Sequence, residues 1–420
     1  MDRSDSCGTI SRREREEGRT THDPDHQGLL RDPAGSQQHV APFELFFDLV
    51  FVFAVMQLSH RLLDDLTLEG TAQTLLLLLV VWSAWITTTW LTNWLNPDLL
   101  SVRLMLVWVM LASLFMSAAI PDAFGDRALT FALAIVAIHV GRAGFAFLTL
   151  RASVGKSHPL TRTYQRTLTW HLAAGLCWIA GGLLDGRARY LLWGLALAMN
   201  YAAPLIGYWI PGLGASRTQE WMVQGMHFAE RCRLFIIIAL GESLLVTGTT
   251  FTEGATSTAT TAAFVAAFVG SVALWWVYFH RSAEAASRVL ASTTDSGRLA
   301  RSAYTYLHLP MVAGIIAVAA ADELTVAHPG DRGIPASVAL TLGGAMLFLA
   351  GHALFRWAVL RQLPWSHLIA MLVLAILAPV GLMTSTLLLS AATVLVLAGL
   401  AAWETLTARA QLRSPHRSAA

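Results

Sequence analysis

Charged side chains inside long apolar segments are the residues of this chain whose types and spacing could do chemistry. Glu44 and Asp48 stand four positions apart in the first apolar segment, so a helix would present both on one face. Gln57 follows further along the same segment. A charge at membrane depth costs about 2.5–3.5 kcal/mol, so it usually pairs, faces a watery cavity or serves a function. Glu44 has a simpler interpretation, a position beside lipid headgroups at the positive end of a helix dipole.

A second apolar segment carries more titratable groups. His227 precedes Glu230 by three positions and Arg231 by four, so one helix face would collect all three side chains. Glu242 lies twelve residues beyond Glu230, about 18 Å along a helix axis. Two interpretations stay open. The acids of both segments converge inside the bilayer to bind a cation or relay protons, or a structural ion pair joins the two segments.

Other polar side chains are scattered singly through the apolar segments. Taken alone, each is more often a hydrogen-bonded interior residue than a functional one. The secondary candidates for a polar pathway are Arg142, His171, Asn200 and His308.

The elements that must position these residues are membrane helices. The chain has 420 residues, of which 55% are hydrophobic and 13% charged, whereas a soluble domain carries about 25% charged residues. Apolar runs recur from Phe43 to Trp403. Only helices or closed barrels satisfy the backbone in lipid, and runs such as Thr74–Val81 do not alternate as barrel strands do. The sequence predicts an all-α polytopic membrane protein whose partner is the lipid bilayer.

We expect about twelve transmembrane helices, because each crossing needs about 20 mainly apolar residues. The expected spans are 43–63, 71–94, 99–120, 127–150, 164–184, 188–210, 226–249, 259–280, 299–321, 334–360, 364–384 and 386–405. The resulting organisation is a disordered polar tail at 1–40, a six-helix half at 41–210, a linker at 211–225, a second six-helix half at 226–405 and a tail at 406–420.

The two halves show signs of a duplication. Leu49–Gln57 can be aligned with Leu234–Glu242, and the same alignment places Trp90 on Trp275. It also places Asp48 opposite Arg233, a residue of opposite charge. Because each half would hold an even number of helices, the halves would share one orientation and form a parallel repeat.

The distribution of basic residues predicts the orientation of the chain. Lys and Arg concentrate in the loops that would lie on the same side as the N-terminal tail. By the positive-inside rule both termini and the 211–225 linker are cytoplasmic. The tail contains no apolar stretch ending in a cleavage site, so the first helix is expected to act as an uncleaved insertion signal.

Two blocks of the sequence resemble a known family. Phe43–Ala54 resembles the opening signature of the low temperature requirement A (LtrA) family, and His227–Ser243 resembles its second hallmark. Trp275–Phe279 also fits that family. The resemblance extends over roughly residues 40–405. It implies a bacterial inner-membrane protein, and it does not define a molecular activity.

Motifs for several other chemistries are missing or incomplete. HExxH and GxSxG do not occur, and Cys7, Cys177 and Cys232 form no CxxC pair. Gly155–Ser157 resembles the end of a phosphate-binding loop, but Leu150 stands where that motif needs its first glycine. We therefore expect no catalytic residue, no cofactor, no metal and no nucleic-acid partner.

The favoured function is a transporter or channel for a small cation or a proton-coupled solute. Carboxylates in the first helix of each half, Glu44, Asp48, Glu230 and Glu242, would bind the ion or proton, and His227 would tune them. One alternative is a membrane-stress or cold-related sensor or scaffold without flux, which the family name invites. A further alternative is an intramembrane lipid-modifying enzyme, which rests only on the clustering of Glu and His. A homo-oligomer remains open.

Overall fold

The computed structural model describes residues 28–31, 40–255, 257–280 and 282–413, with side chains as far as 409. Most of the expected tail at 1–40 and the end of the chain beyond 413 lie outside the described residues. The predicted disorder of the tail is not supported at 28–31, which are attached to the helices. Leu30 pairs with Leu95 in an isolated bridge, and the Arg31 backbone amide donates to the Trp94 carbonyl at 2.9 Å.

Within the described residues, every regular element is helical. In chain order they are α1 (Pro42–Asp64), α2 (Leu68–Trp94), α3 (Leu100–Ala119), η2 (Ile120–Asp122), α4 (Ala128–Ser153), α5 (Pro159–Leu183), α6 (Arg187–Ala202), η3 (Thr218–Trp221), α7 (Gly225–Glu253), α8 (Thr258–Phe279), α9 (Ser282–Ser292), α10 (Ser296–Leu299), η4 (Ala300–Tyr306), α11 (His308–Ala327), α12 (Pro335–Val338), η5 (Ala339–Gly343), α13 (Gly344–Leu360), α14 (Trp365–Gly381) and α15 (Thr386–Arg413). The all-helical prediction is confirmed.

Nine helical stretches of the described chain are long and apolar enough to cross a membrane. The expected count of twelve is not confirmed, because α5, α6 and α14 do not meet the same criteria. The 16 residues of α6 extend about 24 Å, which is short of a hydrocarbon core of about 30 Å. The nine stretches that do meet the criteria indicate a multi-pass membrane protein.

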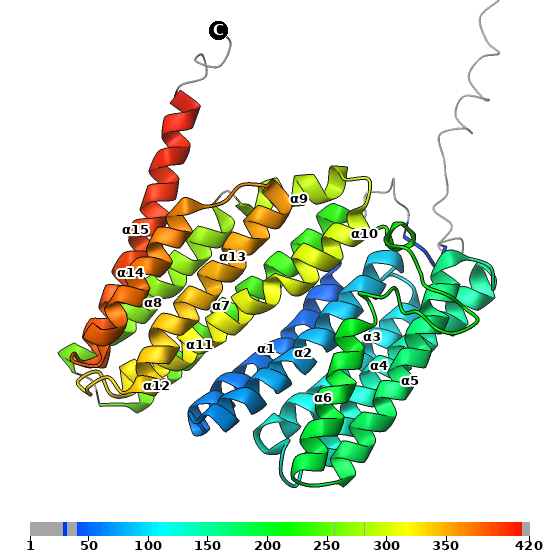
Figure 1. Cartoon of the computed structure of the whole chain (residues 1–420), viewed down its shortest axis with the longest axis horizontal. Coiled ribbons are helices and arrows are strands. Elements are labelled where there is room, and N and C mark those ends of the chain that lie inside the picture. Colours follow the sequence, from blue (N-terminus) through cyan, green and yellow to red (C-terminus); the bar gives the residue numbers. More distant parts are fainter. Residues whose placement is uncertain (1–27, 32–39, 256, 281, 414–420) are drawn as a thin grey trace, which may run out of the picture.

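The helices form two groups that meet along one interface. In Figure 1, α1 to α6 lie on one side and α7 to α15 on the other. Helices α1 and α2 contact α7 and α11 across this interface. Buried rings reinforce it, because Trp82 and Trp85 of α2 pack on Phe235 of α7 with centroids 5.3 and 4.4 Å apart. Such aromatic pairs contribute about 0.5–1.5 kcal/mol beyond their buried area.

Helices α11 and α13 approach closely at a glycine. A Cβ on Gly314 would lie 2.6 Å from the Gly344 carbonyl oxygen and 2.6 Å from the Phe348 amide nitrogen. Small residues at such crossings allow membrane helices to pack backbone to backbone.

We predict that Gly314→Ala lowers the free energy of unfolding by about 1–3 kcal/mol, because the added methyl must push two backbones apart. Gly399→Ala is the matched control, since Gly399 of α15 has open space around it. Thermal unfolding of both purified variants checks this. Equal melting temperatures would show that the crossing is not close-packed.

Candidate functional site

Helices α1 and α7 run side by side in the same direction. Three polar contacts join them: Glu44 with His227, Asp48 with Arg231, and Ser59 with Glu242. Each contact joins residues 183 positions apart in the chain. A constant separation of this kind requires parallel helices in register. The candidate side chains therefore occupy two levels along one helix pair.

The first level is an ion-pair cluster centred on Arg231, which we call the Arg231 cluster. The Arg231 guanidinium donates from Nη2 to Asp48 Oδ1 at 2.7 Å and from Nε to Asp48 Oδ2 at 3.2 Å. Its Nη1 donates to Glu44 Oε1 at 3.0 Å. All three side chains are buried. The two-pronged contact with Asp48 is the geometry that makes arginine–carboxylate pairs strong and directional.

The remaining oxygens of the two acids also have partners. Glu44 Oε2 accepts from Arg31 Nη2 at 2.8 Å and lies 3.0 Å from His227 Nε2. Trp85 Nε1 donates to Asp48 Oδ1 at 2.7 Å. The Arg231 cluster thus contains two carboxylates, Glu44 and Asp48, and two guanidinium groups, and its formal charges balance.

A neutral histidine completes the Arg231 cluster. The Asn93 side-chain nitrogen lies 3.0 Å from His227 Nδ1. Because the Asn93 amide donates to Nδ1, the single proton of the neutral His227 ring lies on Nε2. The ring can then donate this proton in a hydrogen bond to Glu44. The cluster is satisfied without a bound ion, so it is suited to fastening α1 to α7.

The second level is centred on Glu242, and here the acid has no basic partner among the described residues. The Glu242 carboxyl is 1% exposed, its Oε2 lies 3.5 Å from the Ser59 hydroxyl, and its Oε1 has no partner. The charged group that acts on Glu242 is another acid, Glu323 of α11. Glu323 is half-buried and its Oε2 is also without a partner. We call Glu242, Glu323 and Ser59 the Glu242 site.

No basic side chain in the described part of the chain forms a salt bridge with Glu242. A buried charge without a partner is costly, and such a group normally takes up a proton or a cation. The Glu242 site can therefore exchange a proton or a small cation, whereas the Arg231 cluster is already neutralised.

The comparisons with known proteins identify the family. Residues 39–402 match the bacterial low temperature requirement A protein (LtrA) family. The chain belongs to the LtrA family. An uncharacterized protein of Rhizobium meliloti (strain 1021) is 37% identical to this LtrA chain over 342 residues, which cover 81% of this chain and 83% of that protein. No solved structure matches the chain.

The structure of this LtrA protein divides the acids that were expected to converge between two levels. Glu44 and Asp48 meet Arg231 and His227, but Glu242 lies eleven residues beyond Arg231, about 16 Å along α7. Gln57 and Glu230 are half-buried and take part in none of the hydrogen bonds at either level. They are helix neighbours that face other directions.

The secondary candidates fall into two separate places. In the first half, Arg142 donates to the hydroxyls of Thr87 and Thr88, and His171 stacks on His139 with ring centroids 4.8 Å apart. Asn200 lies close to His171.

In the second half, His308 lies 2.9 Å from the Tyr278 hydroxyl and stacks on Tyr304. These residues join neither the Arg231 cluster nor the Glu242 site.

Several participants at the two levels were not anticipated from the sequence of this LtrA chain. Arg31 belongs to a tail expected to be disordered, and Trp85 and Asn93 were not among the expected site residues. Glu323 fell outside the expected span 299–321, whereas α11 continues to Ala327. Two adjacent acids, Asp322 and Glu323, at the end of an apolar run were the signal that could have identified this end of α11.

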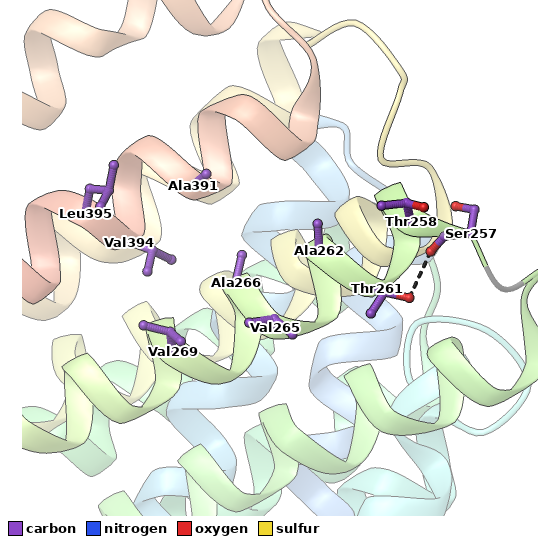
Figure 2. A pocket seen from close by; sticks show the side chains of 10 residues that line it. All are labelled: Ser257, Thr258, Thr261, Ala262, Val265, Ala266, Val269, Ala391, Val394 and Leu395. Atoms are coloured by element: carbon purple, nitrogen blue, oxygen red, sulfur yellow. Dashed lines mark hydrogen bonds between the residues drawn. The ribbon is translucent and has the colours of Figure 1, made fainter.

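The described residues contain no group of three or more His, Cys, Asp or Glu placed to hold a metal ion. An open groove of about 930 Å³ lies between α8 and α15, and Figure 2 shows the side chains that line it. Its walls are apolar, with Ser257, Thr258 and Thr261 at one end, and no titratable side chain lines it. This groove suits contact with lipid and offers no chemistry to either level.

Proposed function

We propose that this LtrA protein is a proton-coupled transporter of the bacterial inner membrane, with both termini cytoplasmic, in which Glu242 carries the proton. The observation that supports the proposal is a buried carboxyl with one unpartnered oxygen, another acid nearby and no basic partner among the described residues. Isolated carboxyl groups inside membrane bundles are expensive and usually serve an ion or proton pathway.

The proposal assigns different roles to the acids that the sequence grouped together. Glu44 and Asp48 fasten α1 to α7 through Arg231, and they do not move ions. Their oxygens are occupied, and freeing them would leave Arg231 as a buried, unpaired charge. Glu242 has no such partner, so it can gain and lose a proton without breaking a salt bridge.

The position of the Glu242 site also supports coupled transport. Glu242, Ser59 and Glu323 come from α7, α1 and α11, which bring the two helix groups together. A protonation change at this junction would alter the cost of keeping the groups packed. The parallel course of α1 and α7 fits the proposed parallel repeat, and carriers of that design bind ions between their halves.

A scaffold without flux is the second candidate, because the balanced Arg231 cluster alone explains a tightly joined bundle. Proton movement into liposomes separates the two candidates. Purified protein in liposomes with an imposed pH gradient, and valinomycin with potassium to compensate charge, should dissipate the gradient faster than empty liposomes. Decay at the rate of empty liposomes, with and without candidate solutes, would favour the scaffold.

A further inference from the structure

A narrow cavity lies between the two helix groups, away from both levels of the α1–α7 pair. It has a volume of about 70 Å³. Its walls come from α2, α4, α5, the segment between α6 and α7, and η4. Its lining includes Arg142, Thr163, His171, Trp221 and Arg301.

Unpartnered hydrogen-bond donors gather around this cavity. Arg142 Nε, Thr163 Oγ1 and Trp221 Nε1 have no partner, although all three side chains are buried. His171 also lines the cavity, where it lies close to the Asn200 side chain. An unsatisfied buried donor costs about 1–3 kcal/mol, so three of them around one cavity indicate an absent acceptor.

The charge of the lining is positive. Arg142 is 1% exposed, and its guanidinium contacts the hydroxyls of Thr87 and Thr88 and a nitrogen of His139. Arg301 donates to the Pro204 carbonyl at 2.8 Å. Neither arginine forms a salt bridge within the described part of the chain. A buried guanidinium without an acid is costly, and an anion in the cavity would offset that cost.

The size of the cavity limits the ligand. An engineered cavity of about 150 Å³ holds one benzene molecule, so about 70 Å³ admits only a few non-hydrogen atoms. A guanidinium matches planar oxyanions, because its parallel N–H groups fit two oxygens. We propose that this cavity binds a small planar oxyanion, a short carboxylate or an inorganic equivalent such as bicarbonate or nitrate.

The anion would be the transported solute if the proposed function holds, and to that extent the inference rests on it. Binding itself does not depend on transport, so it can be measured separately. Thermal unfolding of the purified full-length protein in detergent, at constant ionic strength, should be compared in sodium formate, acetate, bicarbonate, nitrate and gluconate.

We expect a saturable rise in melting temperature with one or more of the small planar anions, because a ligand that binds only the folded state stabilises it. Gluconate, which is too large for the cavity, should give none. Comparing formate and acetate with bicarbonate and nitrate shows whether the ligand is a carboxylate or an inorganic oxyanion. An identical melting temperature in all five salts would overturn the proposal.

Substitutions locate the binding. Arg142→Met should weaken the apparent affinity by about tenfold or more. Because this variant risks misfolding, Thr163→Val and Trp221→Phe each remove one donor without changing charge, and each should weaken binding. Arg288→Gln, which alters an exposed side chain on α9, is the matched control. Unchanged affinity in all three cavity variants would overturn the site. Glu242→Gln should abolish proton coupling and retain anion binding, so the two proposals fail separately.

A second, smaller cavity is lined by an acid, whereas the first is lined by two arginines. It has a volume of about 20 Å³ and is lined by Asp322, Thr341, Ser390 and Thr393 from α11, η5 and α15. Asp322 is 6% exposed and its Oδ2 has no partner. The hydroxyls of Thr341 and Thr393 donate to backbone carbonyls at 2.9 Å. Their lone pairs therefore remain as acceptors around an unpaired acid.

The geometry points to a single dehydrated monovalent cation of sodium size at Asp322. The volume matches one water-sized particle. One carboxylate with neutral hydroxyls suits a monovalent ion, whereas Mg²⁺ loses its water reluctantly and demands octahedral ligands. Thr341 lies on η5, a π-helical turn, and such turns are frequent at functional sites.

Thermal unfolding in sodium, potassium and N-methylglucamine chlorides tests this site. Sodium should raise the melting temperature of the wild-type protein most, and Asp322→Asn should abolish the difference. Thr393→Val should weaken the apparent sodium affinity severalfold and guards against a general effect of the Asp322 substitution. Glu284→Gln, which alters an exposed acid on α9, should keep the sodium response. Equal stability in all three chlorides, or an undiminished response in Asp322→Asn, would overturn the assignment.

Discussion

Glu242→Gln should reduce proton-coupled flux in liposomes by at least about tenfold, which corresponds to about 1.4 kcal/mol. The amide has the shape of the protonated acid but cannot release a proton. The melting temperature should stay unchanged or rise, because the substitution removes an acid that is buried without a basic partner. Dye-reported internal pH in liposomes and thermal unfolding in detergent measure the two effects.

The control for this variant is Glu284→Gln, which alters an acid on α9 whose side chain is 73% exposed. It should keep wild-type flux. Wild-type flux in Glu242→Gln would remove Glu242 from the pathway. A large loss of stability in Glu242→Gln would instead show that the carboxylate has a structural partner.

Arg231→Met should lower the free energy of unfolding by about 3–5 kcal/mol, the cost of leaving a buried ion pair without one partner. Arg231 provides three hydrogen bonds to Glu44 and Asp48. Without it, Glu44 would keep Arg31 and His227, and Asp48 would keep only Trp85. Denaturant or thermal unfolding of the purified variant gives the measurement.

The double variant Asp48→Asn, Arg231→Met should recover at least half of that loss, because Glu44 and Arg31 then balance each other. Arg288→Gln removes an exposed pair, whose side chains are 64% and 73% exposed, and should cost about 0–1 kcal/mol. If the double variant is as unstable as Arg231→Met, the destabilisation does not arise from unpaired charge.

The sequence was a sufficient guide to the helices that hold the site. The expected spans 43–63 and 226–249 agree with α1 and α7 to within a few residues, because length and apolar composition dominate membrane helices. The family was also identified correctly from the blocks on these two helices. The shorter helices were less predictable, since α14 is apolar but falls below a full span and α6 has only 16 residues.

Partner choice across the α1–α7 interface depended on rotation about the helix axis. The repeat alignment paired Asp48 with Arg233, whereas its partner is Arg231. Two residues correspond to about 200° around a helix, so Arg233 faces away when Arg231 faces α1. The positions of His227 and Arg231, four residues apart, were the better guide.

Two residues of these sites could not be predicted from the local sequence pattern. Arg31 reaches Glu44 from a polar segment whose composition gives no indication of attachment. Glu323 acts on Glu242 from a helix far along the chain. Their placement depends on how α1, α7 and α11 pack, which neither charge spacing nor hydropathy determines.

The central claim, that Glu242 exchanges a proton while Glu44 and Asp48 are held by Arg231, can be measured directly by carbodiimide labelling. Dicyclohexylcarbodiimide reacts with protonated carboxyl groups in apolar surroundings, and mass spectrometry locates the adduct. We predict labelling at Glu242 that declines as the pH rises, with little at Glu44 or Asp48. Labelling of Glu44 or Asp48 in preference to Glu242, or none at Glu242 at any pH, would contradict the account.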